Sequence, residues 1–563
     1  MIRWLSLLLL ISVGFCHRYF SPFDFLKYEE AVVNTDPSVV ITVTPNQLNK
    51  SGDWVTVAWD GVSHPSDTDW IGVYAPPNGE ESIDPSKIAP VKYQYCNESS
   101  THMSSGKGSF KIRLVNVRTP YMFALLKGGF DAPSLVATSK QVTFSSPNEP
   151  LQPHLALTSD PTTLLLTWNT RDSKEPKVKF WQNTTTNIRT QAATSNKYTS
   201  KDMCGPPATT VGYIDPGMLH TAKLSGLTPG QEYNYQFGDD PEWSQVFSFR
   251  MPPAPSPNAS ISFIAFGDMG QAQVDDTLRP LYVHAQPPAV NNTNLMAKEV
   301  NERDLVLHIG DISYAIGYAG VWDEFFDLIQ PISSRVPYMV CGGNHERDYP
   351  HSGSYYEGTD SGGECGVPYE MRFQMPRPDP KQHWYDFSLG SVHFVLMSTE
   401  IDFTVNSVQY NWLKDHLSSV DRSVTPWLIF AGHRPMYIDS DYGLLPSSDL
   451  VVSKELQDNI EPLLLEYKVD LAFWGHHHSY QRTCPVAKKV CQDDGTAPVH
   501  VVIGMAGHSL STNIQNKQPD WIRFVDVDDY GYTRISVSPL SLTLEYIKSD
   551  GTTKDTFTLK HTK

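Results

Sequence analysis

The sequence predicts an α/β domain that is preceded by two all-β sandwich domains. At 563 residues the chain is too long for one hydrophobic core. Up to about residue 253, short runs of alternating apolar and polar residues are separated by Gly, Pro and Asp, a pattern typical of antiparallel strands. From residue 258 onward, continuous apolar runs alternate with amphipathic stretches, which indicates strands covered on both faces by helices.

The first residues read as a leader that is removed from the mature protein. One Arg precedes a short apolar stretch from Trp4 to Phe15, which is too short to span a bilayer, so we predict a signal peptide over 1–16. No later segment has the length and apolar character of a membrane helix, and the polar end "DTFTLKHTK" argues against a lipid anchor. We therefore expect a secreted or lumenal protein without a membrane anchor.

Cysteine usage agrees with an oxidising compartment. Loss of the leader would remove Cys16 and leave an even set of six cysteines. Cys484 and Cys491 are close in sequence and are predicted to form one disulfide, whereas the other pairings stay open. Triplets for N-glycosylation predict a glycoprotein and stand at Asn49, Asn97, Asn183, Asn258 and Asn291.

The two β domains are expected over 38–149 and 150–253. In the first, runs such as "VVITVTP" and "DWVTVAWDG" alternate between apolar and polar residues. In the second, "LSGLTPGQEYNYQF" leads from turn residues into a Tyr-rich strand and resembles a fibronectin type III-like module, which we interpret as a structural spacer. A short Pro-rich linker, "MPPAPSPNAS", then leads into a third domain over 258–563 that includes a C-terminal β segment.

Strands and helices are expected to alternate in the third domain. Apolar runs predict buried strands over 260–266, 304–309, 336–341, 425–430 and 469–474. Amphipathic stretches predict helices over 294–303, 321–329 and 408–417.

Each of these five strands ends in Gly followed by a potential ligand. The endings are "GDMG" at 267–270, "GDISY" at 310–314, "GGNHE" at 342–346, "AGHRP" at 431–435 and "GHHH" at 475–478. Ligands of α/β sheets bind beyond the carboxyl ends of the strands, so these side chains should converge on one site. Gly fits a sharp strand exit at which a Cβ would obstruct the turn.

The side chains collected in this way form a ligand set for divalent or trivalent metals such as Zn, Mn and Fe. They are Asp268, Asp311, Tyr314, Asn344, His433, His476 and His478. Seven donors are more than one catalytic metal needs. They suit two metals that share a carboxylate, with roughly 3.5–4 Å between the two metals. Because side chains alternate in an extended segment, His476 and His478 should face the site while His477 points away.

The ordered motifs resemble those of the purple acid phosphatase family, in particular its long plant-type branch. That resemblance implies a mixed β-sandwich flanked by helices, the metallophosphoesterase type of catalytic domain. It also implies that Asp268, Tyr314 and His478 hold Fe(III) and that Asp311 bridges the two metals. A second, divalent metal (Zn, Mn or Fe) would be held by Asn344, His433 and His476. A Tyr phenolate on Fe(III) gives the family its charge-transfer colour.

The resemblance implies hydrolysis of phosphate monoesters, as in an acid phosphatase, by attack of a metal-activated hydroxide on phosphorus. His345 resembles the histidine with which the family contacts substrate, and we assign it a catalytic role in binding phosphate or protonating the leaving group. The alternative for His345 is that it supports the metal ligands without contacting the substrate.

The segment after His433 departs from the family. Well-studied secreted members carry two histidines there, but "GHRPMYIDSDYG" contains none from Arg434 through Gly443. Arg434, assigned as catalytic, and Tyr437 could contact phosphate instead, because a guanidinium suits phosphate oxygens. A structural ion pair is an equal alternative for Arg434. This pattern resembles members associated with phosphodiester or nucleotide pyrophosphate hydrolysis.

Three further features are given lesser roles. His308, within an apolar strand, is predicted to be a hydrogen-bonded core histidine. His508, near a Gly-rich turn, is not counted among the predicted site residues. The run "SYYEGTD" is interpreted as a solvent-facing rim loop that could stack a nucleobase.

Small phosphorylated molecules are the expected partners: phosphomonoesters, phosphodiesters or nucleotides. A formal net charge of −18 argues against extended polynucleotides. A homodimer is suggested by resemblance alone. The alternative function is a non-catalytic binding or adhesion protein with a degenerate phosphatase site, and a phosphoprotein phosphatase is disfavoured by the leader and by Tyr314.

Overall fold

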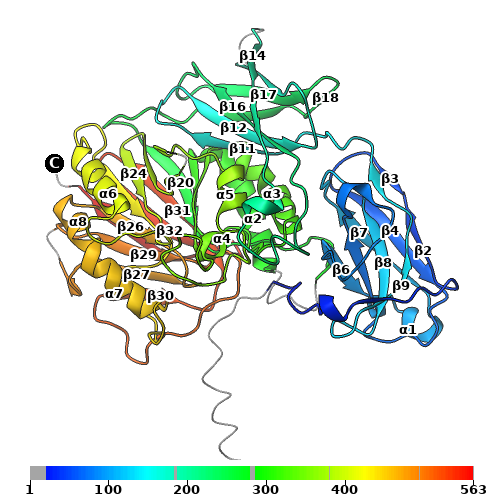
Figure 1. The fold of residues 1–563 in the computed structure, drawn as a ribbon. Helices are drawn as coiled ribbons and strands as arrows, with labels where there is room; N and C mark the ends of the chain where they lie inside the picture. The colour runs from blue at the N-terminus through cyan, green and yellow to red at the C-terminus, as the bar shows by residue number, and fades with distance from the viewer. Residues whose placement is uncertain (1–20, 183–186, 279–285, 380, 493–494, 562–563) are drawn as a thin grey trace, which may run out of the picture.

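The computed structural model describes residues 21–182, 187–278, 286–379, 381–492 and 495–561. The predicted leader over 1–16 and the triplet at Asn183 lie outside these residues. Two β units precede a larger unit in which two sheets are flanked by helices (Figure 1). The fold class expected from the sequence is confirmed.

The first β unit is a sandwich in which β4 buries alternate residues. In β4, Val55, Val57 and Trp59 are buried, and the residues between them are more exposed. One sheet has the order β1-β9-β8-β5-β6, with strands Val32–Val33, Ser134–Thr138, Met122–Lys127, Trp70–Tyr74 and Lys92–Tyr95. The other contains β2 (Val40–Thr44), β4 (Asp53–Asp60) and β7 (Gly108–Leu114), while β3 (Gln47–Leu48) pairs with β10 (Thr143–Phe144) and α1 spans His102–Ser105.

The second β unit is built from two antiparallel sheets. The first has the order β11-β12-β16-β15, with strands Leu151–Leu157, Leu164–Thr170, Met218–Leu224 and Thr194–Asn196. The second contains β14 (Arg189–Ala192), β13 (Lys177–Gln182), β17 (Glu232–Asp239), β18 (Glu242–Trp243) and β19 (Phe247–Arg250). Tyr235 stacks on Phe237 and lies tilted against Phe249, with all three rings buried, which gives this unit an aromatic core.

The third unit is a sandwich of a six-stranded and an eight-stranded sheet. The six-stranded sheet has the order β22-β21-β20-β31-β32-β33, with strands Tyr338–Cys341, Leu305–Ile309, Ile261–Phe266, Gly531–Ser538, Ser541–Lys548 and Thr553–Lys560. The eight-stranded sheet contains β23 (Tyr385–Leu389), β24 (Val392–Leu396), β25 (Trp427–Ala431), β26 (Leu471–Trp474), β29 (Val499–Ile503), β27 (Tyr480–Ala487), β28 (Val490–Cys491) and β30 (Ile522–Asp526). Phe263 meets Phe394 edge-on between the sheets, with ring centroids 5.3 Å apart.

Helices cover the outer faces of both sheets. Phe325, Phe326 and Ile329 of α3 recur at helical spacing and are buried in the core on the side of the six-stranded sheet. Leu413 of α6 and Leu456 of α7 pack in the core outside the eight-stranded sheet. The helices are α2 (Pro287–Glu299), α3 (Gly320–Ser333), α4 (Asn344–Arg347), α5 (Val367–Arg372), α6 (Val408–Ser419), α7 (Asp449–Asn459) and α8 (Glu461–Glu466).

The five strands with Gly endings are divided between the two sheets. Along the chain, the hairpin β23–β24 comes between the first three and the last two. β20, β21 and β22 belong to the six-stranded sheet, whereas β25 and β26 belong to the eight-stranded sheet. Their carboxyl ends therefore meet between two sheet edges.

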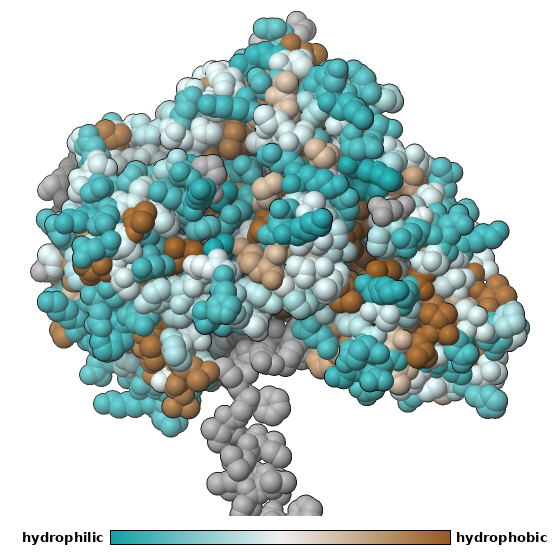
Figure 2. All heavy atoms as spheres, in the orientation of Figure 1, coloured by the Kyte–Doolittle hydropathy of each residue, from teal (hydrophilic) through white to brown (hydrophobic). Residues whose placement is uncertain are grey.

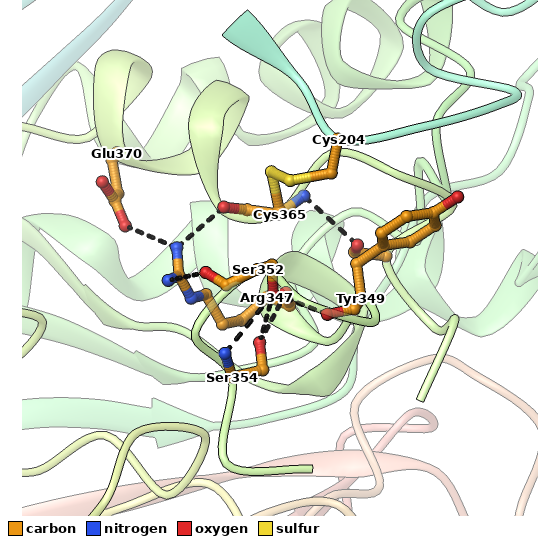
Figure 3. The surroundings of a disulfide bond; sticks show 8 residues. Cys204, Arg347, Tyr349, Ser352, Ser354, Cys365 and Glu370 are labelled. Carbon is orange, nitrogen blue, oxygen red and sulfur yellow. Dashed lines mark hydrogen bonds and ion pairs between the residues drawn. A yellow bond between two sulfur atoms is a disulfide. The ribbon is translucent and has the colours of Figure 1, made fainter. Parts of the chain in front are cut away.

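The two disulfides of the described residues join cysteines that are 7 and 161 residues apart in the sequence. The predicted pair Cys484–Cys491 is confirmed and closes the β27–β28 hairpin. The second disulfide joins Cys204 of the second β unit to Cys365 of the third (Figure 3). The pairings that the sequence left open are thus resolved as one disulfide and two buried thiols, Cys96 and Cys341.

A buried cation joins the first β unit to the third. Lys92 on β6 is 1% exposed, and its Nζ lies 3.0 Å from Glu324 of α3 and 3.4 Å from Asp275. It also donates to the Gln273 side chain at 2.7 Å. Gln273 and Asp275 belong to the loop that follows β20, so the first β unit contacts the loop that carries the "GDMG" motif.

The surface in Figure 2 is mostly hydrophilic, with scattered hydrophobic groups that include several over the first β unit. Exposed apolar residues of that unit include Val32, Val33, Val40 and Trp54. Among the described residues, no helix combines the length and apolar character that a membrane crossing requires.

We predict that Lys92→Met lowers the free energy of unfolding by about 3–5 kcal/mol, because it leaves two buried carboxylates without their cation. Urea unfolding followed by tryptophan fluorescence measures the change. The matched control is Lys107→Met, which removes a 2.8 Å ion pair with Asp60 that is 60% and 58% exposed and should change stability little. Equal effects of the two substitutions would contradict the role of the buried cluster.

Candidate metal centre

The structure brings all seven predicted ligand residues together at the carboxyl ends of strands from both sheets. Each of them lies within 3.4 Å of at least one other through side-chain atoms. Asp268, Asp311 and Asn344 follow strands of the six-stranded sheet, and His433, His476 and His478 follow strands of the eight-stranded sheet.

The first group of donors surrounds the Tyr314 hydroxyl. Tyr314 Oη lies 2.9 Å from His478 Nε2 and 3.4 Å from a carboxylate oxygen of both Asp268 and Asp311. His478 Nε2 lies 3.4 Å from Asp268 Oδ1. Asp268, Asp311 and His478 are all buried and can place three ligand atoms within 4.8 Å of one another, a separation that suits one metal ion.

The second group surrounds the Asn344 carbonyl oxygen. Asn344 Oδ1 lies 3.1 Å from His433 Nε2 and 2.9 Å from His476 Nδ1. His433 Nε2 also lies 3.2 Å from Asp311 Oδ2. Asp311, His433 and His476 form a second set that could hold a metal, so Asp311 belongs to both sets.

The strand exits bend through the ligand residues themselves. Asp268, Asp311, Tyr314 and His476 have φ of 60°, 48°, 53° and 68°, the left-handed region that costs free energy for residues other than Gly. The neighbouring Gly residues provide space: a Cβ on Gly343 would lie 2.3 Å from Asp311 Oδ1. The predicted steric reason for Gly is supported, but much of the turning is done by the ligands.

The three adjacent histidines adopt bends and not the extended segment that was expected. His477 N donates to Gly475 O at 2.8 Å and Ser479 N donates to His477 O at 2.7 Å, which are two successive three-residue turns. His476 and His478 face the centre, while the His477 ring contacts Ser479 Oγ at 2.7 Å. The predicted orientation is therefore found, for a different reason.

Contacts behind the ligands aim their donor atoms inward. His433 Nδ1 lies 3.0 Å from Ile309 O and His478 Nδ1 lies 2.6 Å from Ser509 O, so each ring directs Nε2 to the centre. Asn344 Nδ2 donates to Asp360 Oδ2 at 3.1 Å, which leaves its carbonyl oxygen facing the histidines.

Glu346 holds the loop around Asp311 in place. Its carboxylate accepts hydrogen bonds from the backbone N–H groups of Asp311, Ile312 and Gly343 at 2.8–2.9 Å. Burial, together with the charge of Asp311, raises the pKa of Glu346 to about 8.

The donor set fits a pair of cations. Asp268 and Asp311 are 0% and 1% exposed, and among the described residues no Lys or Arg forms an ion pair with either. Burial raises the pKa of Asp268; it would do the same for Asp311, but the charges of His433 and His345 hold the Asp311 pKa well below its usual range. Burial disfavours the His433 cation, yet Asp311 and Asp268 raise the His433 pKa to about 10. The two buried carboxylates thus favour positive charge nearby, and bound metal ions would supply that charge in place of a protonated histidine.

The two residues predicted to be catalytic differ in their surroundings. His345 borders the centre: its backbone N–H donates to Asp311 Oδ1 at 3.0 Å and its Nε2 lies 3.9 Å from Asp311 Oδ2. The Arg434 guanidinium is 1% exposed and binds Glu400 at 2.9 Å and Asp348 at 3.0 Å. Arg434 Nη1 also donates to Ser447 O at 3.0 Å and lies 3.3 Å from His476 Nε2.

Tyr437 does not lie where a phosphate contact would require. Its hydroxyl is hydrogen-bonded to Glu461 and accepts from Lys489 N, and its ring packs on His500 and Trp521. The rim loop is also less exposed than expected, because Tyr356 is 5% exposed and packs beneath the Arg434 guanidinium.

The structure places His308 in the core and His508 at the centre. His308 is confirmed as a core histidine: it is 0% exposed, its Nδ1 lies 2.9 Å from Tyr338 Oη, and burial lowers its pKa to about 3. His508 lines the centre, with its ring stacked on Tyr314 at 4.1 Å. The signal for His508 was available, since "VVIGMAGH" is again an apolar run followed by Gly and a potential ligand.

Four protein-family descriptions match the chain in order. They are an Fn3-like domain from purple acid phosphatase over 41–146, a purple acid phosphatase N-terminal domain over 150–251, a calcineurin-like phosphoesterase over 261–480 and an iron/zinc purple acid phosphatase-like C-terminal region over 497–556. The Fn3-like description falls on the first β unit, whereas the sequence suggested such a module in the second.

Individual proteins match along most of the chain. A protein named "Probable inactive purple acid phosphatase 27" from Arabidopsis thaliana is 38% identical over 554 residues, covering 93% of this chain and 89% of its own length. A nucleotide pyrophosphatase/phosphodiesterase from Hordeum vulgare is 37% identical over 327 residues, 56% of this chain and 88% of its own. The structure of purple acid phosphatase PPD1 from yellow lupin seeds matches with a TM-score of 0.86 at 35% identity, covering 93% and 96% of the two chains. The chain therefore belongs to the purple acid phosphatase family and has the architecture of a phosphoesterase hydrolase.

Proposed function

We propose that this protein is a secreted, dinuclear metal-dependent phosphoesterase that hydrolyses phosphate monoesters. The observation that carries the proposal is the convergence of seven donor residues, with the Asp311 carboxylate common to both metal-binding sets. Secretion is supported by the leader-like sequence over 1–16 and by two disulfides, and small phosphorylated molecules are the proposed substrates.

For the ligands, we assign Asp268, Tyr314 and His478 to Fe(III). A divalent Zn, Mn or Fe ion would take Asn344, His433 and His476, with Asp311 between the two metals. When bound, the cations would neutralise phosphate charge and acidify the attacking water. The phenol oxygen of Tyr314 supports the ferric assignment of the first set, because a hard trivalent ion favours anionic oxygen ligands.

His345 is the proposed substrate-binding and proton-donating residue. Its Nδ1 lies 3.0 Å from Asp360 O, and since a carbonyl can only accept, Nδ1 must be the donor. This contact turns Nε2 toward Asp311 and the centre. When the ring is doubly protonated, Nε2 can donate to a phosphate oxygen or protonate the leaving group.

For Arg434, we propose the structural role that the sequence left as an equal alternative. Its contacts to Glu400, Asp348 and Ser447 commit the guanidinium to protein partners, and its Nη1 contact with His476 links it to a ligand. Removing it would leave two buried carboxylates unpaired. A direct phosphate contact by Arg434 remains the less favoured prediction.

A preference for phosphodiesters or nucleotide pyrophosphates is the second candidate function. The segment after His433 lacks histidine through Gly443, and its residues Met436, Tyr437 and Ile438 are buried, so it offers none of the polar groups that assist monoester cleavage in the family. The barley relative named for pyrophosphatase and phosphodiesterase activity supports the same direction.

A non-catalytic binding protein is the competing function. Several relatives are named "probable inactive", including that from Arabidopsis thaliana which is 38% identical. All seven donor residues are nevertheless present and in contact in this chain, which argues against a degenerate site.

We predict that Asp311→Ala reduces hydrolysis of an aryl phosphate by more than about 100-fold, because loss of even an outer-shell partner of a metal ligand costs about 10–100-fold. Initial rates and bound metal, measured on the same preparation, check the result. Asp304→Asn is the control, since Asp304 is a buried carboxylate at the amino-terminal ends of β20 and β21, opposite the strand ends that carry the candidate ligands, and it pairs with Arg250. Turnover retained by Asp311→Ala would sink the shared-carboxylate assignment.

We also predict that activity follows metal content. Removal of metal with a chelator should abolish turnover, and reconstitution with Fe(III) plus Zn or Mn should restore it together with a visible absorption band. Metal content is measured by mass spectrometry. A protein that binds both metals and remains inactive on every phosphate ester would favour the binding function.

Substrate preference is tested by comparing an aryl phosphate monoester with a bis-aryl diester on the metal-replete protein. If the absent histidine pair shifts the site toward diesters, kcat/KM should be higher for the diester by about 10-fold or more. Higher kcat/KM for the monoester would restore the simple acid phosphatase function.

A further inference from the structure

Two imidazole rings pack against the phenol ring of Tyr314 at centroid distances below 5 Å. His508 stacks on one side, with ring centroids 4.1 Å apart and an angle of 28° between the planes. His345 packs against the same ring at 4.5 Å and 44°. His508 lies in the loop after β29, a loop that contributes none of the assigned metal ligands.

That loop is tied to ligands of the ferric set. His508 N donates to Asp268 O at 3.0 Å, and Ser509 O lies 2.6 Å from His478 Nδ1. Ser511 Oγ accepts from His478 N at 3.1 Å. The His508 ring is 2% exposed and its Nδ1 lies 3.0 Å from Ser509 Oγ, so it is held in one orientation.

The Tyr314 side chain needs such a support. Its backbone has a φ of 53°, in the left-handed region that a bulky residue seldom adopts, so local backbone preference does not stabilise this placement. A flat ring stacked on the phenol limits its rotation and keeps Tyr314 Oη between His478, Asp268 and Asp311.

We propose that His508 is a positioning residue that keeps the phenol oxygen of Tyr314 beside Asp268 and His478 for metal binding. This inference rests on the proposed function for its consequence, the ferric site. Its structural content is the placement of the Tyr314 ring by His508, whose ring also meets that of His478 edge-on at 4.9 Å. Stacked aromatic pairs contribute enough to predict about 2- to 12-fold weaker Fe(III) binding when the His508 ring is removed.

The experiment compares His508→Ala, His508→Phe and the matched control His477→Ala in the full chain. His477 is also 2% exposed and adjacent to two ligands, but its ring contacts Ser479 and Gln481. Fe(III) affinity is measured by competition with a chelator, and the tyrosinate charge-transfer band by visible absorption. We expect weaker binding and a shifted band for His508→Ala, recovery toward the wild type for His508→Phe, and no shift for His477→Ala.

A crystal structure of metal-free His508→Ala separates this inference from the proposed function. Rotation of the Tyr314 ring away from His478 supports the positioning role, even if the wild-type chain takes up no iron and the ferric assignment fails. A Tyr314 ring that stays in place overturns the proposal, as does an equal band shift for His477→Ala.

Discussion

The burial of one carboxylate, that of Asp311, organises this site. At 1% exposure it needs compensation from within the protein, and its partners come from both sheets: Tyr314 and the backbone of His345 on one side, His433 on the other. Glu346 fixes the Asp311 backbone in turn. The sandwich brings two rows of strand ends to the same carboxylate, which neither sheet could do alone.

Local sequence signals were sufficient to select the seven candidate ligand residues that the structure brings together, because an apolar run followed by Gly and a donor is readable within ten residues. The division of these strands between two sheets was not readable, since an apolar run does not reveal which strand it pairs with. The same limit applies to Cys204 and Cys365, which are 161 residues apart. His508 borders the centre although it was left out of the predicted site, and its apolar run obeys the same rule. The prediction that His477 points away from the centre is supported, although the chain there is bent and not extended.

Arg434 shows why chemistry at one position does not determine a role. A guanidinium suits phosphate oxygens and carboxylates equally, so its neighbours in the sequence could not distinguish a substrate contact from an ion pair. The decision lies with Glu400 and Asp348, which come from distant segments and take up the guanidinium. The guanidinium thus takes part in a buried ion-pair cluster beside the candidate metal centre.

The Lys92 cluster has a consequence for how the chain is synthesised. Asp275 lies 183 residues after Lys92, and Glu324 later still. The first β unit is therefore synthesised long before the carboxylates that pair with Lys92. During that interval the nascent unit must leave Lys92 hydrated and its contact face open. Its final burial is therefore a late event of biogenesis, set by emergence of the third unit.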